Sequence, residues 1–185
     1  MSFDKMIGIK SERILLRYLK ESDLAEFLSY RSRPEIAEYQ FWGPFTEKDA
    51  RDYILKYKNE PPWLSGSWTQ LGIVLLKEDK LIGDCALRID SIEPRIGEIG
   101  FNLSPDYQGK GYASEAVRAL LDYTFDTLNM HRIMGVTDSR NTASVKLMER
   151  IGMRKEAHFV KNIWFKGVWG DEYLFAVLKE EWKNA

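Results

Sequence analysis

Two glycines flank a lysine in the segment DYQGKGYASEAV (residues 106–117), and this spacing is typical of a turn that binds a phosphate group. Successive backbone N–H groups of a glycine-rich turn can point into one concavity, and the start of a following helix adds its dipole. Glycine at positions 109 and 111 permits the left-handed backbone that such a turn requires. Because helix-forming residues follow Gly111, the segment predicts an anion site at the start of a helix.

Two common phosphate-binding motifs do not fit this segment. A P-loop requires glycine where Ser104 stands and serine or threonine where Gly111 stands. A dinucleotide-binding turn requires a third glycine or alanine where Ser114 stands, and only one clear strand–helix–strand unit surrounds it. What remains is either a plain strand-to-helix turn, in which glycine serves the geometry alone, or a loop for another phosphate-bearing cofactor.

Residues 108–113, QGKGYA, have the form Gln/Arg-x-x-Gly-x-Gly/Ala. With ERILLRYLKESDL, GEIGFNLSPDYQGKGYASEAV, NTASVKLMERIGM and GVWGDEYLFAVLKEEW, which cover nearly the whole chain in order, this loop resembles the GNAT superfamily of N-acetyltransferases. More narrowly, it resembles the RimJ/RimL-type group of protein N-terminal acetyltransferases. The resemblance implies one GNAT N-acetyltransferase domain over residues 1–185. It also implies direct transfer of an acetyl group from acetyl-CoA to a primary amine, for example a protein N-terminus.

The resemblance further implies where acetyl-CoA binds. The glycine loop would hold the pyrophosphate of coenzyme A on its backbone amides, and Lys110 would contribute at most screening charge. The strand before the loop would part from the next parallel strand, so that the pantetheine arm bonds in the gap as an extra strand would. The residues expected to contact the cofactor are Phe101, Asn102, Leu103, Gln108, Gly109, Lys110, Gly111, Tyr112, Ala113, Ser114 and Asn141.

Glu98 is the candidate general base. On a regular strand over residues 95–103, Glu98 shares a face with Gly100 and Asn102. A carboxylate in the middle of a central strand is costly unless it is partnered or functional. Glu98 could take the proton of the incoming ammonium directly or through water. The alternatives are a salt bridge to a neighbouring Arg or Lys, and a chain of waters that replaces a side-chain base.

Asn141 and Ser144 stand at the predicted start of the helix over residues 141–152. Both residue types favour helix N-caps, so capping alone would explain them. The resemblance implies that Asn141 also hydrogen-bonds the pantetheine arm. It implies that Ser144 protonates the leaving thiolate, and an alcohol can do this only by hydrogen bonding or relay.

Trp42 is the candidate contact for the acceptor, because it lies in an aromatic segment that borders the acceptor pocket in the resembling family. The alternative is a hydrophobic lid over one end of the sheet. Two further interpretations of the whole protein stay open. One keeps the cofactor but changes the acceptor to a polyamine, an amino acid or an aminoglycoside. The other is a non-catalytic, regulatory module that binds coenzyme A.

Alternating apolar patterns and turn signals predict the elements that position these residues. The order of elements is β-α-α-β-β-β-α-β-α-β-β, which indicates an α/β (α+β) class with a mixed sheet and helices on both faces. The resemblance implies the GNAT acyl-CoA N-acyltransferase fold, whose mostly antiparallel central sheet contains one splayed parallel pair. We expect strands over residues 13–19, 67–76, 81–89, 95–103, 132–138, 162–167 and 171–178, and helices over 22–31, 46–59, 112–128 and 141–152.

Composition limits the partners. A net charge of −1 disfavours a general nucleic-acid binder, and the longest apolar runs are far shorter than a membrane span. The N-terminal segment MSFDKMIGIKSERI lacks the features of a signal peptide, and the single cysteine, Cys85, fits a reducing compartment, so we expect a cytoplasmic protein. His131 and His158 are isolated in sequence, so we expect no metal. Homodimers are common in the resembling group, and no residue here decides the oligomeric state.

Overall fold

The computed structural model describes residues 8–183. The expectation of no signal peptide rests partly on residues 1–7, which lie outside this range. The elements along the chain are β1 (Ile9–Lys10), β2 (Ile14–Arg17), α1 (Leu24–Arg31), α2 (Pro34–Ala37), α3 (Glu47–Asn59), β3 (Trp68–Leu75), β4 (Lys80–Ile89), β5 (Ile96–Leu103), α4 (Tyr112–Asp126), β6 (Arg132–Asp138), α5 (Thr142–Arg150), β7 (Arg154–Phe165), β8 (Val168–Leu178) and α6 (Lys179–Lys183), with short 3₁₀ turns at Glu21–Asp23 and Pro105–Tyr107.

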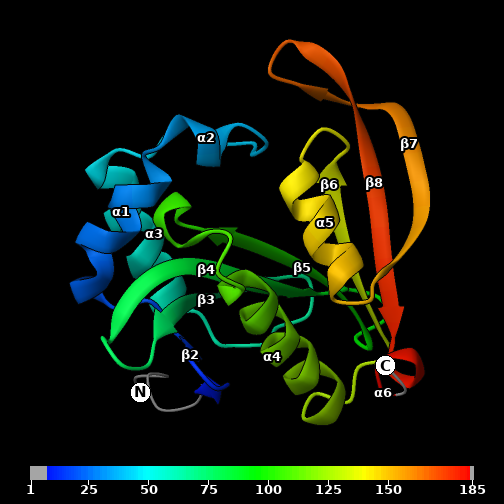
Figure 1. Cartoon of the computed structure of the whole chain (residues 1–185), viewed down its shortest axis with the longest axis horizontal. Helices are drawn as coiled ribbons and strands as arrows, with labels where there is room; N and C mark the ends of the chain where they lie inside the picture. The colour runs from blue at the N-terminus through cyan, green and yellow to red at the C-terminus, as the bar shows by residue number, and fades with distance from the viewer. Residues whose placement is uncertain (1–7, 184–185) are drawn as a thin grey trace.

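The strands of the described chain form one eight-stranded sheet in the order β1-β2-β3-β4-β5-β6-β8-β7. Every neighbouring pair is antiparallel except β5 and β6, which are parallel. This arrangement confirms the predicted mixed sheet with one parallel pair. Figure 1 shows that the long hairpin of β7 and β8 rises beyond the rest of the molecule.

Helices cover both faces of the sheet, as predicted. Alternate residues of β3 point to opposite sides, so Ile73 and Leu75 join a core with α4 and α5, whereas Val74 joins a second core with α1 and α3. Figure 1 shows α4 and α5 in front of the central strands, and α1 and α3 together at the left of the view. Strands β2, β3 and β4 contribute residues to both cores and therefore lie between them.

Local sequence explains how the helices begin. Thr46 caps α3, because its hydroxyl accepts from the Asp49 amide and the Asp49 carboxylate accepts from the Thr46 amide. The sequence predicts Ser22 or Asp23 as the N-cap of α1, and the structure confirms the position but not the side-chain cap. Asp23 stands at the N-cap position, but its carboxylate does not cap the helix and instead binds buried Arg17, with an N–O distance of 2.7 Å. Leaving a buried guanidinium without its carboxylate costs more free energy than leaving a helix end without a side-chain cap.

Strand β7 was predicted too short. The sequence suggested residues 162–167, whereas the strand runs over Arg154–Phe165. β7 is the last strand of the sheet and most of its residues are exposed, so it lacks the apolar alternation that marks a half-buried strand. Its partner β8 buries Phe175, Ala176 and Val177 and was therefore easier to recognise.

Candidate active site

The parallel strands β5 and β6 pair over only three residues and then part. Their register runs from Ile96 opposite Arg132 to Glu98 opposite Met134. Beyond this point β5 stays paired with β4 as far as Leu103, and β6 stays paired with β8 as far as Asp138. The two facing edges therefore carry unpaired backbone N–H and C=O groups in the middle of the sheet. Such edges can pair with an extended ligand as they would with another strand.

A cavity of about 500 Å³ lies at this gap. On β5 its lining alternates between the two faces of the sheet, because Ile99 packs in the core beneath α4 and α5 whereas Glu98 and Asn102 lie on the opposite face. Residues from both faces of the sheet therefore line the cavity. Six of the residues singled out in the sequence line it: Trp42, Glu98, Phe101, Asn102, Asn141 and Ser144.

The remaining predicted cofactor residues lie outside the cavity lining. Leu103 is buried at the end of β5, and residues 108–114 form the turn into α4. Gly109 has φ 74° and Gly111 has φ 84°, so both adopt the left-handed conformation that glycine favours. Gly111 is the N-cap of α4 and has no side chain to cap the first amides of the helix. These amides therefore remain free for an anion such as a pyrophosphate.

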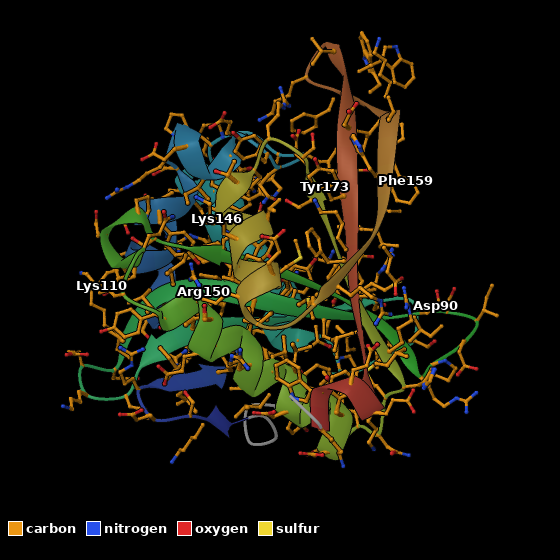
Figure 2. All side chains as sticks on the ribbon, turned by 45° about the vertical axis from the view of Figure 1, so that its right-hand side comes forward. Asp90, Lys110, Lys146, Arg150, Phe159 and Tyr173 are labelled. Atoms are coloured by element: carbon orange, nitrogen blue, oxygen red, sulfur yellow. The ribbon has the colours of Figure 1, made fainter. Side chains whose placement is uncertain are left out.

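Two side chains of the glycine loop have partners within the protein. The Gln108 amide Nε2 donates to the Leu103 carbonyl at 3.0 Å and so ties the loop to the end of β5. The Lys110 ammonium donates to the Asp106 carbonyl at 2.9 Å and remains exposed. In Figure 2, Lys110 lies at the start of α4, and Lys146 and Arg150 project from α5 on the same side of the molecule. This face therefore offers positive charge to phosphate groups.

Glu98 forms the salt bridge that the sequence left as an alternative. Its Oε2 accepts from Arg88 at 2.6 Å, across the β4–β5 pair. The other carboxylate oxygen accepts no hydrogen bond from residues 8–183. Glu98 thus lines the cavity as a partly exposed carboxylate with one oxygen bound and one open.

Asn141 caps α5, because its Oδ1 accepts from the Ser144 amide at 3.2 Å. The capping role weighed in the sequence is therefore real for Asn141. It leaves the Asn141 NH₂ group and the Ser144 hydroxyl free to face the cavity that both residues line. Capping and ligand contact are compatible here, since the cap uses Asn141 Oδ1 and the Ser144 backbone amide and leaves the other polar groups of the two side chains unused.

A buried polar cluster was not recognised in the sequence. Asp84 on β4 is 1% exposed and Arg31 at the end of α1 is 2% exposed. The Arg31 Nη2 and Nε atoms donate to the two Asp84 oxygens at 2.5 and 3.1 Å, and the Tyr30 hydroxyl donates at 2.6 Å. Asn102 and Gln40 extend this cluster into the cavity. The available signal was Asp84 itself, a charge within the otherwise apolar stretch LIGDCAL.

Aromatic rings surround the Arg31 guanidinium. The ring centroids of Trp42, Phe27, Tyr53 and Phe45 lie 4.4, 5.2, 5.3 and 5.5 Å from its Cζ atom. Burial has the largest single effect and lowers the pKa of Arg31, but Asp84, Tyr53 and Tyr30 together raise it, so that the pKa lies above its usual value. Trp42 therefore has a structural partner beneath it as well as a place in the cavity lining, and this position is compatible with both the lid and the acceptor-contact interpretations.

A covalent route through Cys85 is not supported. Cys85 is fully buried in the core, and burial raises the pKa of its thiol far above the usual value.

Within residues 8–183, no three His, Cys, Asp or Glu side chains group closely enough to hold a metal ion. None of the helices over the same residues is long and apolar enough to cross a membrane. A second hollow of about 710 Å³ lies beside α4 and β1, away from the β5–β6 gap, and contains none of the predicted site residues.

The comparisons with known proteins agree with this geometry. Residues 13–154 match the family model of the acetyltransferase (GNAT) domain. The uncharacterized N-acetyltransferase YnaD of Bacillus subtilis is 36% identical over 94% of this chain and 98% of its own. The crystal structure of a GNAT-family acetyltransferase from Bacillus anthracis superposes with a TM-score of 0.86 at 34% identity, covering 94% of this chain and 99% of that one.

Two similar structures have different named activities. The spermidine N-acetyltransferase of Vibrio cholerae, in complex with CoA and spermine, has a TM-score of 0.78 at 25% identity and covers 94% of this chain and all of its own. The ribosomal-protein-S5-alanine acetyltransferase of Vibrio fischeri has a TM-score of 0.77 at 26% identity, with 95% and 98% of the two chains covered. The chain therefore belongs to the GNAT family, as an acetyl-CoA-dependent N-acetyltransferase of its RimJ/RimL-like group.

Proposed function

We propose that this enzyme transfers the acetyl group directly to a cationic primary amine that enters the β5–β6 gap from the face opposite α4 and α5. The observation that carries the proposal is that the cavity at the gap has Glu98 and Asn102 on one face of the sheet and Ser144 on the other. The two substrates would meet in the gap without an intermediate on the protein. Proximity of this kind accounts for a large part of such rate enhancements.

The residues have the following roles in this proposal. Amides of residues 109–114 bind the pyrophosphate, and the open edge of β5 at residues 101–103 binds the pantetheine arm. A backbone N–H of that edge polarises the thioester carbonyl. Glu98 takes the ammonium proton, directly or through water, so that the amine nitrogen can attack the carbonyl carbon. As the C–S bond breaks, the Ser144 hydroxyl donates its proton to the thiolate and is reprotonated, directly or through water, by the proton that the attacking nitrogen loses when it becomes the amide.

The charge of the cavity lining and an exposed aromatic ring support a choice of acceptor. The cavity lining includes four carboxylates, Asp84, Glu98, Asp138 and Glu172, but only one cation, Arg31. Such a lining favours a cationic amine. Phe41, which is 74% exposed, packs edge-on against Phe165 beside the cavity, so an acceptor chain could continue over an apolar surface outside. This observation favours a protein N-terminus, whereas the carboxylates equally suit the second candidate, a polyamine.

A thiol-release assay tests the proposal across acceptor classes. Acetyl-CoA is supplied with peptides that differ in their N-terminal residue, with spermine and with an aminoglycoside, and free thiol is measured over time. We expect release that depends on at least one amine class and product acetylated on nitrogen. Tight acetyl-CoA binding without release against any amine would instead support the non-catalytic module.

Substitutions of Glu98 and Ser144 test their roles in proton transfer. General acid–base groups contribute about 10²- to 10⁴-fold to rate, so Glu98→Gln and Ser144→Ala should each lower kcat by about 100-fold with acetyl-CoA affinity unchanged. Glu93→Gln is the matched control, because Glu93 also pairs with an arginine, Arg95, but lies outside the cavity lining. Unchanged turnover in both variants would assign proton transfer to water instead.

A further inference from the structure

The segment over residues 38–45, named here the acceptor loop, has no regular secondary structure yet borders the cavity through Tyr39, Gln40, Phe41 and Trp42. The loop follows α2 and leads to α3, and it is held by the Gln40 backbone amide, which donates to the Ala37 carbonyl at 3.0 Å, and by Lys166 Nζ, which donates to the Glu38 carbonyl at 3.2 Å. Its backbone is tied to α1 at one point, where the Phe45 amide donates to the Arg31 carbonyl at 3.0 Å. The side chain of the same Arg31 lies beneath Trp42, with 4.4 Å between its Cζ atom and the ring centroid.

The orientation of the Asn102 amide follows from Asp84. The Asp84 carboxylate already accepts from Arg31 and Tyr30, and an ionised carboxylate can only accept. The group of Asn102 that faces it at 3.2 Å must therefore be the NH₂ end. The carbonyl oxygen then points the other way, where it accepts from Gln40 Nε2 of the acceptor loop at 3.3 Å.

Asn102 keeps unused hydrogen-bonding capacity in this orientation. A side-chain amide has two N–H donors and two lone pairs on oxygen, and the contacts with Asp84 and Gln40 use one of each. One lone pair and one N–H remain on a half-buried side chain that lines the cavity. A fixed carbonyl oxygen with a free lone pair can accept from the N–H of an incoming ammonium.

We propose that Arg31 and Asp84 are positioning residues for the acceptor: Asp84 sets the Asn102 amide so that its oxygen receives the ammonium, and Arg31 holds the acceptor loop against it. This inference rests on the proposed function, because it assigns the binding of the amine in that reaction. Neither Arg31 nor Asp84 touches the reacting atoms. Both residues also belong to the cavity lining, and in this proposal they act through Asn102, Gln40 and Trp42.

Hydrogen exchange of the acceptor loop gives a test that needs no acceptor. The triple variant Tyr30→Phe/Arg31→Met/Asp84→Leu removes the buried polar groups together, and replacing a buried ion pair by apolar residues is often tolerated. We expect amides over residues 38–45 to exchange about tenfold faster, the change expected when one hydrogen bond to a charged group is lost. Unchanged exchange in the loop would overturn the proposal.

The matched control is the second buried ion pair of the chain. Arg17 and Asp23 are joined at 2.7 Å and are similarly buried, but neither lines the cavity. The variant Arg17→Met/Asp23→Leu should leave exchange over residues 38–45 unchanged. Loss of protection in both variants would show a general loosening of the fold, which would also overturn a specific positioning role.

Steady-state kinetics complete the test, with spermine and a peptide that has an N-terminal serine as acceptor probes. Asn102→Ala and the triple variant should raise the KM for whichever probe the unmodified enzyme acetylates by about tenfold, with acetyl-CoA affinity by calorimetry unchanged. Equal KM values in the variants and the unmodified enzyme would contradict the role of Asn102. If the unmodified enzyme acetylates neither probe, the choice of acceptor is wrong, whereas the exchange result still decides the positioning of the loop.

Discussion

Replacing Gly111 with valine is expected to weaken acetyl-CoA binding by about 100-fold or more. Gly111 has φ 84°, a conformation in which a β-branched residue is strained, and its added Cβ would lie 3.4 Å from the Arg13 guanidinium. The backbone would shift at the N-cap of α4, where the proposed pyrophosphate amides begin. Each hydrogen bond to a charged group contributes about 1.5–3 kcal/mol, so the loss of one or two gives this effect. Calorimetric titration with acetyl-CoA measures it.

Gly152→Val controls for backbone strain. Gly152 follows the end of α5 with φ 94° and, like Gly109, has open space around its Cβ position. Valine there should lower the free energy of unfolding through strain alone and leave the Kd for acetyl-CoA within about twofold of the unmodified value. Equal weakening in both variants would mean that the turn into α4 needs glycine for geometry only.

Asp84→Ala is expected to give the largest loss of stability among single substitutions in the site, about 3–5 kcal/mol. The change leaves the Arg31 guanidinium charged and buried without its carboxylate, and it also removes the acceptor of the Tyr30 hydroxyl. The raised pKa of Arg31 depends on Asp84, so the guanidinium loses the contact that favours its charged form in the core. Urea unfolding followed by circular dichroism measures the change in free energy.

Arg88→Gln provides the comparison for this stability measurement. The Arg88–Glu98 pair is partly exposed, and such pairs contribute about 0–1 kcal/mol. The variant should therefore unfold at nearly the same urea concentration as the unmodified protein. A similar loss for Asp84→Ala and Arg88→Gln would show that burial adds nothing to the Arg31–Asp84 pair.

Much of the fold could be predicted because its signals are local. The capping box at Thr46, the hairpin of β3 and β4, and the glycine after α5 are each encoded within a few neighbouring residues. The misjudged features depend on contacts distant in sequence. The length of β7 is set by pairing with β8, and Asp23 binds Arg17 rather than capping α1. Neither preference appears in the periodicity of the segment itself.

The same distinction between local signals and contacts distant in sequence applies to the candidate site. The glycine loop and Asn141 were recognised because their motifs are contiguous, and Glu98 because a carboxylate in a central strand is unusual. The Arg31–Asp84 cluster was missed because its two members are 53 residues apart and join only when α1 packs on β4. Gln108 stays a predicted cofactor contact, and the bond of its side chain to the Leu103 carbonyl was not foreseen because it depends on how the loop folds back on β5.

A single-turnover experiment tests direct transfer across the gap most directly. Enzyme in excess is mixed with acetyl-CoA and an amine identified in the acceptor panel, and thiol, N-acetylated product and intact protein mass are followed in the same samples. The expected result is that thiol and product appear at the same rate and in equal amounts, while the protein mass stays unchanged throughout. Thiol release without amine, together with an acetylated protein that later transfers its acetyl group, would contradict the account.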